Sequence, residues 1–174
     1  MPMDNVYTGA NGTLSLATEN TPEGQDGKVV WSAYSKTPEV GRVTGVQIRV
    51  RTDLKEYYQI GQRHPVSLNP ENVAISGEID RAYMNGALLF LLLRRGAGPT
   101  AVKEPYVQPT FTLKLTLNDS AVPNNKAALE LKGVKFMNWG VEVPENDFVI
   151  ENVEFKALAI SVVDSEKPPK FPKG

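Results

Sequence analysis

The chain contains 174 residues, enough for one sizeable hydrophobic core but few for two, so a single domain is expected. Its 19 basic and 20 acidic residues leave a formal charge of -1, which excludes the strongly basic surface of most nucleic-acid-binding proteins. The sequence has no cysteine, and this excludes disulfides, thiolate metal sites and a cysteine nucleophile.

The first residues, 1–12, are polar and contain two glycines, which predicts an extended N-terminal arm. They show neither a basic start nor an apolar stretch, so no secretory signal is expected. A short strand is predicted over residues 13–17, because Leu14 and Leu16 share one face of an extended chain.

Residues 18–41 are predicted to form a long loop, since several prolines and glycines interrupt regular structure there. The segment also carries an apolar cluster of Val29, Val30, Trp31 and Tyr34. A disordered linker rarely carries tryptophan and tyrosine together. Two interpretations stay open: the loop folds back onto its own core, or it docks on a partner.

Two half-buried strands are predicted between residues 41 and 80. In residues 45–51 apolar side chains alternate with polar ones, and residues 71–80 show the same alternation. The sequence Asn-Pro-Glu-Asn at 69–72 is a strong turn signal, so it is expected to separate two short strands.

One helix is predicted over about residues 81–93. Asp80 would cap its first turn, Arg94 and Arg95 would place positive charge at its last turn, and Gly96 would end it. Its last seven residues carry no polar side chain, so it needs cover on every side, from a second sheet or a neighbouring subunit. This apolar run is far below the roughly 20 residues that span a bilayer, and no membrane segment is expected.

The clearest strand pattern lies in residues 106–117, where Phe111 and three leucines alternate with threonines and a lysine. A loop rich in glycine, proline and alanine is predicted before it, at 94–105. A turn is predicted after it, at 118–126.

A further strand is predicted over residues 128–143, but its in–out phase becomes ambiguous after Gly133. A bulge, or a strand covered on both faces, would produce that pattern. Residues 144–147 predict a turn, and residues 148–163 predict a final long strand whose phase changes near Ala157.

Together these elements predict a mainly β fold, a β-sandwich or partial barrel of about eight strands with one flanking α-helix. The domain is expected to span residues 13–163. Residues 164–174 are expected to form a flexible tail, because their prolines and lysines exclude a strand ladder.

No catalytic, cofactor-binding or metal-binding residue is predicted, and no cofactor. The only histidine, His64, lies beside a proline in a predicted turn, and no nucleophile, P-loop or metal-ligand spacing appears. Two other classes stay open. One is a carbohydrate-binding sandwich with Trp31, Tyr57 and Tyr58 as its aromatic platform, and the other is a β-sandwich hydrolase with a carboxylate pair.

The order of elements resembles that of phage tail tube proteins. The likeness rests on GRVTGVQIRV at 41–50, on EYYQIGQRHPVSLNPENVAISGEIDRAYMNGALLFLLL at 56–93, and on VIENVEFKALAISVV at 149–163. It implies an orthogonal β-sandwich with a flanking helix, six copies closing into a ring, and rings stacking into a hollow tube. DNA passes down such tubes during infection, whereas related tubes of contractile injection and type VI secretion systems carry protein effectors.

The resemblance implies a structural virion protein, the major tail tube subunit, made in the host cytoplasm and located in the tail. Implied partners are other copies of the chain and the sheath, tape-measure, baseplate and tail terminator proteins. The near-zero net charge suits a conduit, because each added phosphate contact would slow the exit of DNA.

Two sets of residues are candidates for these roles, and residues 1–12, 18–41 and 94–105 are expected to join stacked rings. The candidate subunit interface consists of Trp31, Tyr34, Tyr83, Leu88 and Leu92. The candidate polar wall or lumen consists of Gln47, Arg49, Arg51, Thr110, Thr112, Lys114 and Thr116.

Overall fold

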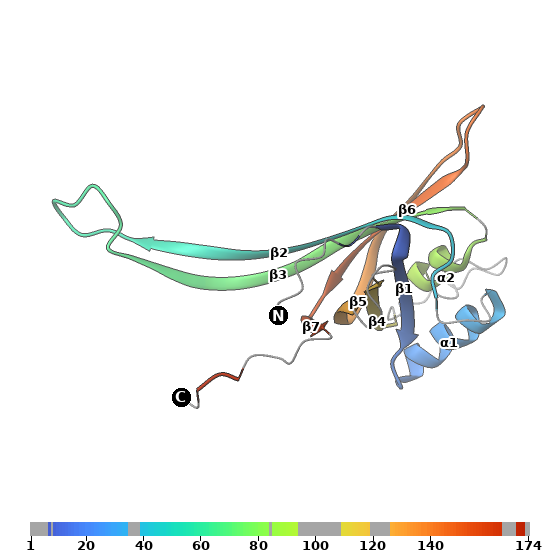
Figure 1. Cartoon of the computed structure of the whole chain (residues 1–174), viewed down its shortest axis with the longest axis horizontal. Coiled ribbons are helices and arrows are strands. Elements are labelled where there is room, and N and C mark those ends of the chain that lie inside the picture. Colours follow the sequence, from blue (N-terminus) through green and yellow to red (C-terminus); the bar gives the residue numbers. More distant parts are fainter. Residues whose placement is uncertain are drawn as a thin grey trace.

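The structure is a computed structural model that describes residues 7, 9–34, 39–83, 85–93, 109–118, 126–164 and 170–172. The strands are β1 (Gly12–Thr18), β2 (Val43–Tyr57), β3 (Ser67–Ala82), β4 (Phe111–Asn118), β5 (Lys126–Glu142), β6 (Ile150–Ala157) and β7 (Ala159–Asp164). The helices are the 3₁₀ turn η1 (Gly9–Asn11), α1 (Pro22–Tyr34) and α2 (Ala87–Leu93). The predicted mainly β class is confirmed (Figure 1).

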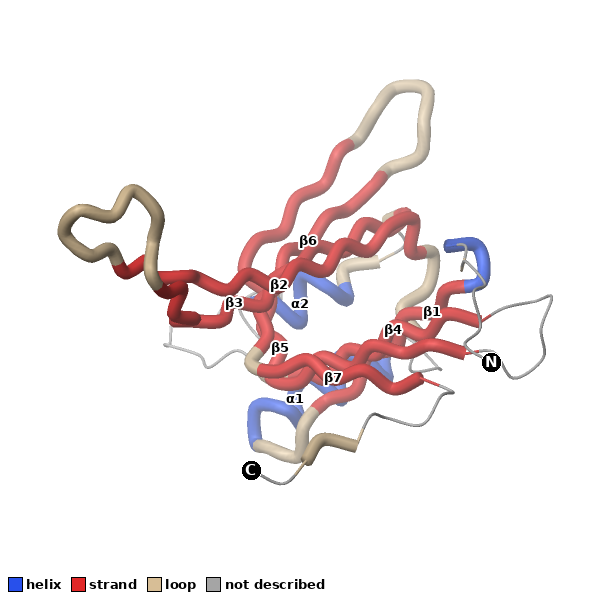
Figure 2. The backbone as a smooth tube through the Cα atoms, turned by 60° about the vertical axis from the view of Figure 1, so that its left-hand side comes forward, coloured by secondary structure: helices blue, strands red, loops and turns tan. Residues whose placement is uncertain are grey.

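The strands of the described part form one curled antiparallel sheet with the order β1-β4-β5-β6-β3-β2, and β7 also pairs with β5. β5 belongs to two halves of this sheet, because its first part pairs with β4 and β7 and its second part pairs with β6. We call β1, β4, β7 and the first part of β5 the short half. We call β2, β3, β6 and the second part of β5 the long half. Figure 2 shows β2, β3 and β6 as a layer above β1, β4 and β7.

The predicted change of phase in β5 is confirmed. Gly133 has a φ of 66°, a left-handed conformation that glycine adopts without strain. The register against β6 then shifts between Phe136 and Asn138. These irregularities let one strand leave the short half and join the long half, so residues before and after them obey different in–out patterns.

The core lies between the two halves. The rings of Phe111 and Phe136 stack with their centroids 5.2 Å apart. The alternation predicted for β4 is confirmed, since Phe111 and Leu113 are buried and Lys114 is exposed. Both halves and both helices contribute further buried side chains, among them Leu16, Trp31, Ile79, Leu88, Leu91, Leu131, Val153 and Phe155.

The prediction of a loop over residues 18–41 is wrong for Pro22–Tyr34, which form the helix α1. Pro22 occupies the first helical position, where its missing N–H costs nothing, and Thr21 Oγ1 accepts a hydrogen bond from the Gly24 N–H at 3.0 Å. A Cβ at Gly27 would lie 3.3 Å from the ring of Phe111. The residues that indicated a loop therefore start the helix and let it approach the core closely.

The start predicted for the second helix is also wrong, because residues 81 and 82 still belong to β3 and α2 begins at Ala87. Asp80 does not cap the helix; its carboxylate accepts a hydrogen bond from Asn152 Nδ2 at 2.5 Å. The residues predicted to end the helix, 94–96, lie outside the described residues, as do the whole of the loop predicted at 94–105 and residues 119–125 of the predicted turn.

The turn predicted at residues 69–72 lies inside β3, and the chain reverses at residues 58–66 instead. A register shift beside Thr52 accommodates one extra residue of β3, and β6 pairs with β3 only from Ile75 onward. Pro70 therefore sits where β3 has just one neighbouring strand, which is where a sheet tolerates proline. Residues 51–73 extend from the sheet as a two-stranded hairpin, here called the arm (Figure 1).

The final strand predicted over residues 148–163 is divided at Leu158 into β6 and β7, and the phase change near Ala157 is confirmed. The Leu158 N–H donates to the Lys132 carbonyl at 3.0 Å, which holds the division against β5. The N-terminal arm predicted over residues 1–12 is described only at residue 7 and from Gly9 onward, where η1 forms.

Candidate assembly surfaces

A buried ion pair joins β3 to β6 on the core side of the long half. Arg81 Nε donates to Glu151 Oε1, and the two side chains are 2% and 0% exposed. Trp139 Nε1 donates to the second oxygen of Glu151 at 2.9 Å. Arg81 Nη2 also reaches the backbone oxygen and Oδ1 of Asn85, both at 3.3 Å. The pair therefore fixes β3, β5 and β6 to one another and holds the segment before α2.

Sequence reasoning missed this pair. Its only local signal is the in–out alternation along each strand. Arg81 lies on the same face of β3 as the buried Ile79, and Glu151 lies on the same face of β6 as the buried Val153. A charged residue in the apolar register of a strand requires a buried partner.

We expect Asn85→Ala to lower the free energy of unfolding by about 1–2 kcal/mol. Asn85 Oδ1 accepts from the Ala87 N–H at 3.2 Å as well as from Arg81, so the substitution leaves a helix amide and a guanidinium without this acceptor. Urea denaturation measures the loss. Asn138→Ala is the control, because Asn138 bonds only an exposed Glu154 oxygen. Equal losses in the two variants would contradict the capping role.

The outer face of the long half is polar. In the register of β2 and β3, Gln47 lies opposite Glu78 and Arg49 lies opposite Ser76. Arg49 Nη2 donates to Gln47 Oε1 at 2.6 Å, and Glu154 on β6 lines the same shallow depression of about 190 Å³. Both signs of charge are therefore mixed on this face.

The residues predicted as one polar wall belong to two surfaces. Gln47 and Arg49 lie on the outer face of the long half, and Arg51 follows them where the arm begins and pairs with Asp53 at 3.3 Å. Thr112, Lys114 and Thr116 lie on β4, in the short half, and Thr110 precedes that strand. Within the single chain the two sets therefore lie on different halves of the sheet.

The residues predicted as a subunit interface fall into two groups, one buried within the single chain and one exposed. Trp31 and Leu88 are 8% and 0% exposed in the single chain, and Leu92 packs against the core. Tyr34 and Tyr83 are exposed, and the Tyr34 ring lies 5.9 Å from that of Phe90. Because α1 and β5 both pack against α2, the buried side chains of the helix, Ala87, Leu88 and Leu91, find their cover within the chain.

The arm carries an exposed apolar face that sequence reasoning missed. Leu54 lies opposite Pro70 and Glu56 opposite Leu68, in continuation of the face that Val50 and Ile75 begin. Every residue of the arm is exposed, and its tip adds Tyr58, Ile60 and Val66. So many apolar side chains in solvent, on two strands with no third layer, are typical of an interaction surface.

The long half also has two open borders. Within the described residues, β2 pairs only with β3, and the second part of β5 pairs only with β6. An open border presents unpaired backbone N–H and C=O groups that another strand can join.

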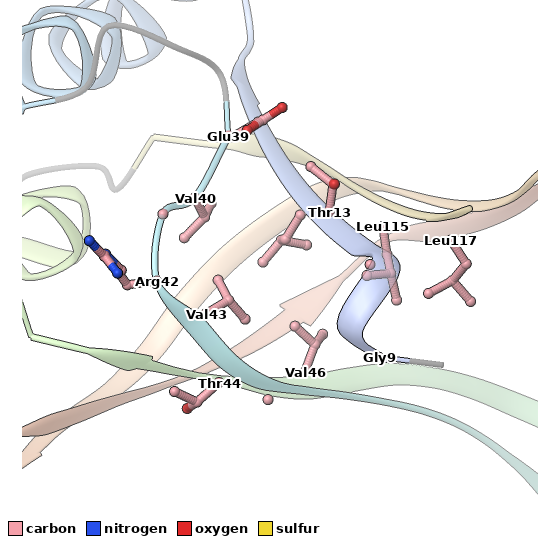
Figure 3. A pocket seen from close by; sticks show the side chains of 14 residues that line it. Gly9, Thr13, Glu39, Val40, Arg42, Val43, Thr44, Val46, Leu115 and Leu117 are labelled. Carbon is pink, nitrogen blue, oxygen red and sulfur yellow. The ribbon is translucent and has the colours of Figure 1, made fainter. Parts of the chain in front are cut away.

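A pocket of about 440 Å³ opens between the first residues of β2, the first residues of β1 and the last residues of β4. Figure 3 shows Val40, Val43 and Val46 on one side of it and Leu115 and Leu117 on the other. Glu39 and Arg42 stand at its rim, and Arg42 has a φ of 59°, which is uncommon for a residue other than glycine. The pocket is thus apolar inside and charged at its edge.

The described residues contain no cluster of three or more His, Asp or Glu side chains that could hold a metal ion. Among the helices that the structure describes, none combines the length and the apolar character needed to cross a membrane.

Comparison with solved structures identifies the fold of the chain. No protein-family model and no curated protein sequence matches the chain. A chain of the anti-feeding prophage baseplate matches with a TM-score of 0.63 and 13% identity, over 95% of this chain and 100% of that one. The SPP1 tail tube matches with a TM-score of 0.59 and 9% identity, over 91% of this chain and 80% of that one.

The chain has the tail tube fold. A chain of the sheath–tube complex of an extracellular contractile injection system shares it, with a TM-score of 0.60 and 8% identity over 92% and 93% of the two chains. The predicted resemblance to tail tube proteins is therefore confirmed at the level of the fold.

Proposed function

We propose that this protein is the major tail tube subunit of a tailed phage or a related phage-like particle. Six copies close into a ring, and stacked rings form the conduit through which DNA is ejected. The observation that carries the proposal is the long half, a set of four strands with two open borders, an apolar inner face and a polar outer face.

Ring closure is supported by the backbone chemistry of those borders. If the β2 border of one copy joins the β5 border of the next, every long half becomes part of one closed barrel. Closure removes the exposed edges, which would otherwise promote aggregation. The polar face that carries Gln47 and Arg49 then lines the lumen, and the face of β4 that carries Lys114 belongs to a different surface.

Passage of DNA is supported by the charge of that lining. Arg49 and Glu78 lie on the same face, and the whole chain has a formal charge of -1. Each net phosphate contact adds affinity through counterion release, so a wall of balanced charge lets a polyanion slide. Sheath, tape-measure, baseplate and tail terminator proteins are the expected partners, and the virion tail the expected location.

The same assembly would serve as the inner tube of a contractile injection or type VI secretion system, which differs in cargo. The sheath–tube complex that shares the fold comes from such a system. The carbohydrate-binding alternative loses support, because Trp31 is buried in the core and cannot stack on a sugar.

Electron microscopy of the purified protein tests the proposal. We expect rings with sixfold symmetry, or tubes built from them, at high protein concentration or when preformed tail ends are supplied as a template. Tubes purified from particles should contain DNA in their lumen during ejection if the cargo is a genome. A protein that remains a compact monomer under all these conditions would contradict the tube role.

A further inference from the structure

We propose that a row of basic side chains across the outer face of the long half binds the phosphate backbone of a nucleic acid. The inference rests on the tube function proposed above, in which this face lines the lumen, and it names nucleic acid rather than a protein effector as the cargo. The row, here called the basic row, consists of Arg49 on β2, Lys156 on β6 and Lys135 on β5.

The strand registers place these three side chains in one line across the sheet. Arg49 lies opposite Ser76 of β3, and Ser76 lies opposite Lys156. Lys156 lies in turn opposite Lys135. All three basic side chains are exposed. Because neighbouring strands are about 4.8 Å apart, the basic row crosses the long half over roughly 14 Å.

A row of acidic side chains lies next to the basic row on the same face. Glu78 of β3 lies opposite Glu154 of β6, and Glu154 accepts a hydrogen bond from Asn138 Nδ2 at 2.7 Å. The two rows are two residues apart along each strand, which corresponds to about 7 Å. The shallow depression of about 190 Å³ has Arg49 on one side and the two carboxylates on the other, so it marks the boundary between the rows.

This arrangement of charge does not favour the stability of the sheet. Lys135 is directly opposite Lys156, and Glu78 is directly opposite Glu154. Like charges in directly opposite positions destabilise a sheet, whereas opposite charges there stabilise it. Among the ion pairs of the described residues, none joins the two rows. A local rule broken at the expense of stability is typical of a surface that serves function.

The ligand that fits the basic row is a regular polyanion. A nucleic acid strand presents one phosphate per nucleotide, and guanidinium and ammonium groups are the side chains that bind phosphate oxygens. A protein effector presents its carboxylates at irregular spacing. The acidic row repels the same phosphates, so it confines the contact to one level in each ring and limits the affinity, which preserves passage.

Co-sedimentation of a short DNA duplex with assembled tubes, at several salt concentrations, tests the site. We expect Lys135→Gln/Lys156→Gln to reduce the slope of log affinity against log salt by about two or more, because each lysine on a phosphate contributes about one. Lys114→Gln/Lys132→Gln is the matched control. It removes the same charge from exposed lysines of the short half, and should leave the slope unchanged.

Charge reversal separates phosphate binding from a structural role. Lys156→Glu places an opposite charge across from Lys135, so it should leave the midpoint of thermal unfolding unchanged or raise it. The same variant should lower the affinity of the tubes for DNA at low salt by about tenfold or more. A lower midpoint with unchanged DNA affinity would show that Lys156 is structural, and would overturn the proposal.

Removal of the acidic row should have the opposite effect on binding. We expect Glu78→Gln/Glu154→Gln to raise the affinity of the tubes for DNA, since it removes the carboxylates that repel phosphate. Unchanged or weaker binding by this variant would contradict the role given to the acidic row.

The remaining outcomes separate this inference from the tube role. Tubes of Lys135→Gln/Lys156→Gln that bind DNA as the unmodified tubes do would overturn the phosphate site and leave the tube function intact. Polyglutamate of matched charge that binds as tightly as DNA would identify an acidic polypeptide as the ligand and overturn the assignment to nucleic acid. Failure of the unmodified protein to form rings or tubes would overturn the tube function and the phosphate site together.

Discussion

Glu151→Gln is expected to lower the free energy of unfolding by about 3–5 kcal/mol, a large part of the roughly 5–15 kcal/mol that a domain has. The substitution leaves the Arg81 guanidinium buried without a counter-charge, at a site where the two side chains are 2% and 0% exposed. It also weakens the acceptor that Trp139 Nε1 bonds. Urea denaturation of the unassembled protein, with an unchanged m-value, measures the loss.

A matched control and a double variant test whether the buried charge is the cause of the loss. Glu154→Gln changes the same residue type on the same strand but on the outer face, and should cost no more than about 0.5 kcal/mol. Arg81→Met/Glu151→Leu removes both charges and should regain most of the loss, because an apolar pair of similar volume needs no counter-charge. Equal stability of Glu151→Gln and Glu154→Gln would show that the buried pair contributes little.

Gly77→Ala is expected to destabilise the protein by about 3 kcal/mol, because β3 has no room for a side chain there. A Cβ at this position would lie 2.2 Å from the Gln47 carbonyl oxygen and 2.5 Å from Phe155 Cζ. Gly77 pairs with Ile48 on one side and Phe155 on the other, so a central strand of the long half must shift to relieve the contact.

Gly140→Ala is the matched control for that substitution. Gly140 also lies within a strand, in the second part of β5, but a Cβ there would meet nothing within 4 Å. We expect its effect to stay within about 0.5 kcal/mol. Thermal unfolding of the two variants side by side measures the difference, and equal midpoints would contradict the close packing of Phe155 on Gly77.

The effect of Gly77→Ala on assembly follows from its position. The long half supplies both borders proposed for ring closure, and Gly77 lies between them on β3, next to the border strand β2. A shift of that strand changes the curvature of the half that must close with five others. We therefore expect fewer rings from Gly77→Ala even at temperatures where the monomer stays folded.

Local patterns predicted the strands well, because in–out alternation is a property of a single extended backbone. The alternation of β4 and the change of phase after Gly133 could both be predicted from neighbouring residues alone. α1 could not, because Pro22 and the glycines beside it are helix breakers in most contexts. In the folded chain Pro22 starts the helix, and Gly27 leaves room for the ring of Phe111, which lies far along the chain.

The candidate assembly surfaces could also be predicted only in part from local patterns. The outward direction of Gln47, Arg49 and Lys114 follows from period two, but the half of the sheet that each belongs to depends on how β5 crosses between the halves. The arm could not be predicted, because residues 69–72 have the sequence of a turn. A register shift beside Thr52 lets β3 continue through them.

The sequence by itself determined the mainly β class, the strand faces and the likeness to tail tube proteins, since these depend on local periodicity and on the order of elements. Only the tertiary structure decided that α1 covers α2, that Arg81 pairs with Glu151 70 residues away, and that arm and pocket lie at opposite ends of β2. Those contacts join residues distant in sequence, and the free energy that selects them arises from packing and charge pairing in the folded chain.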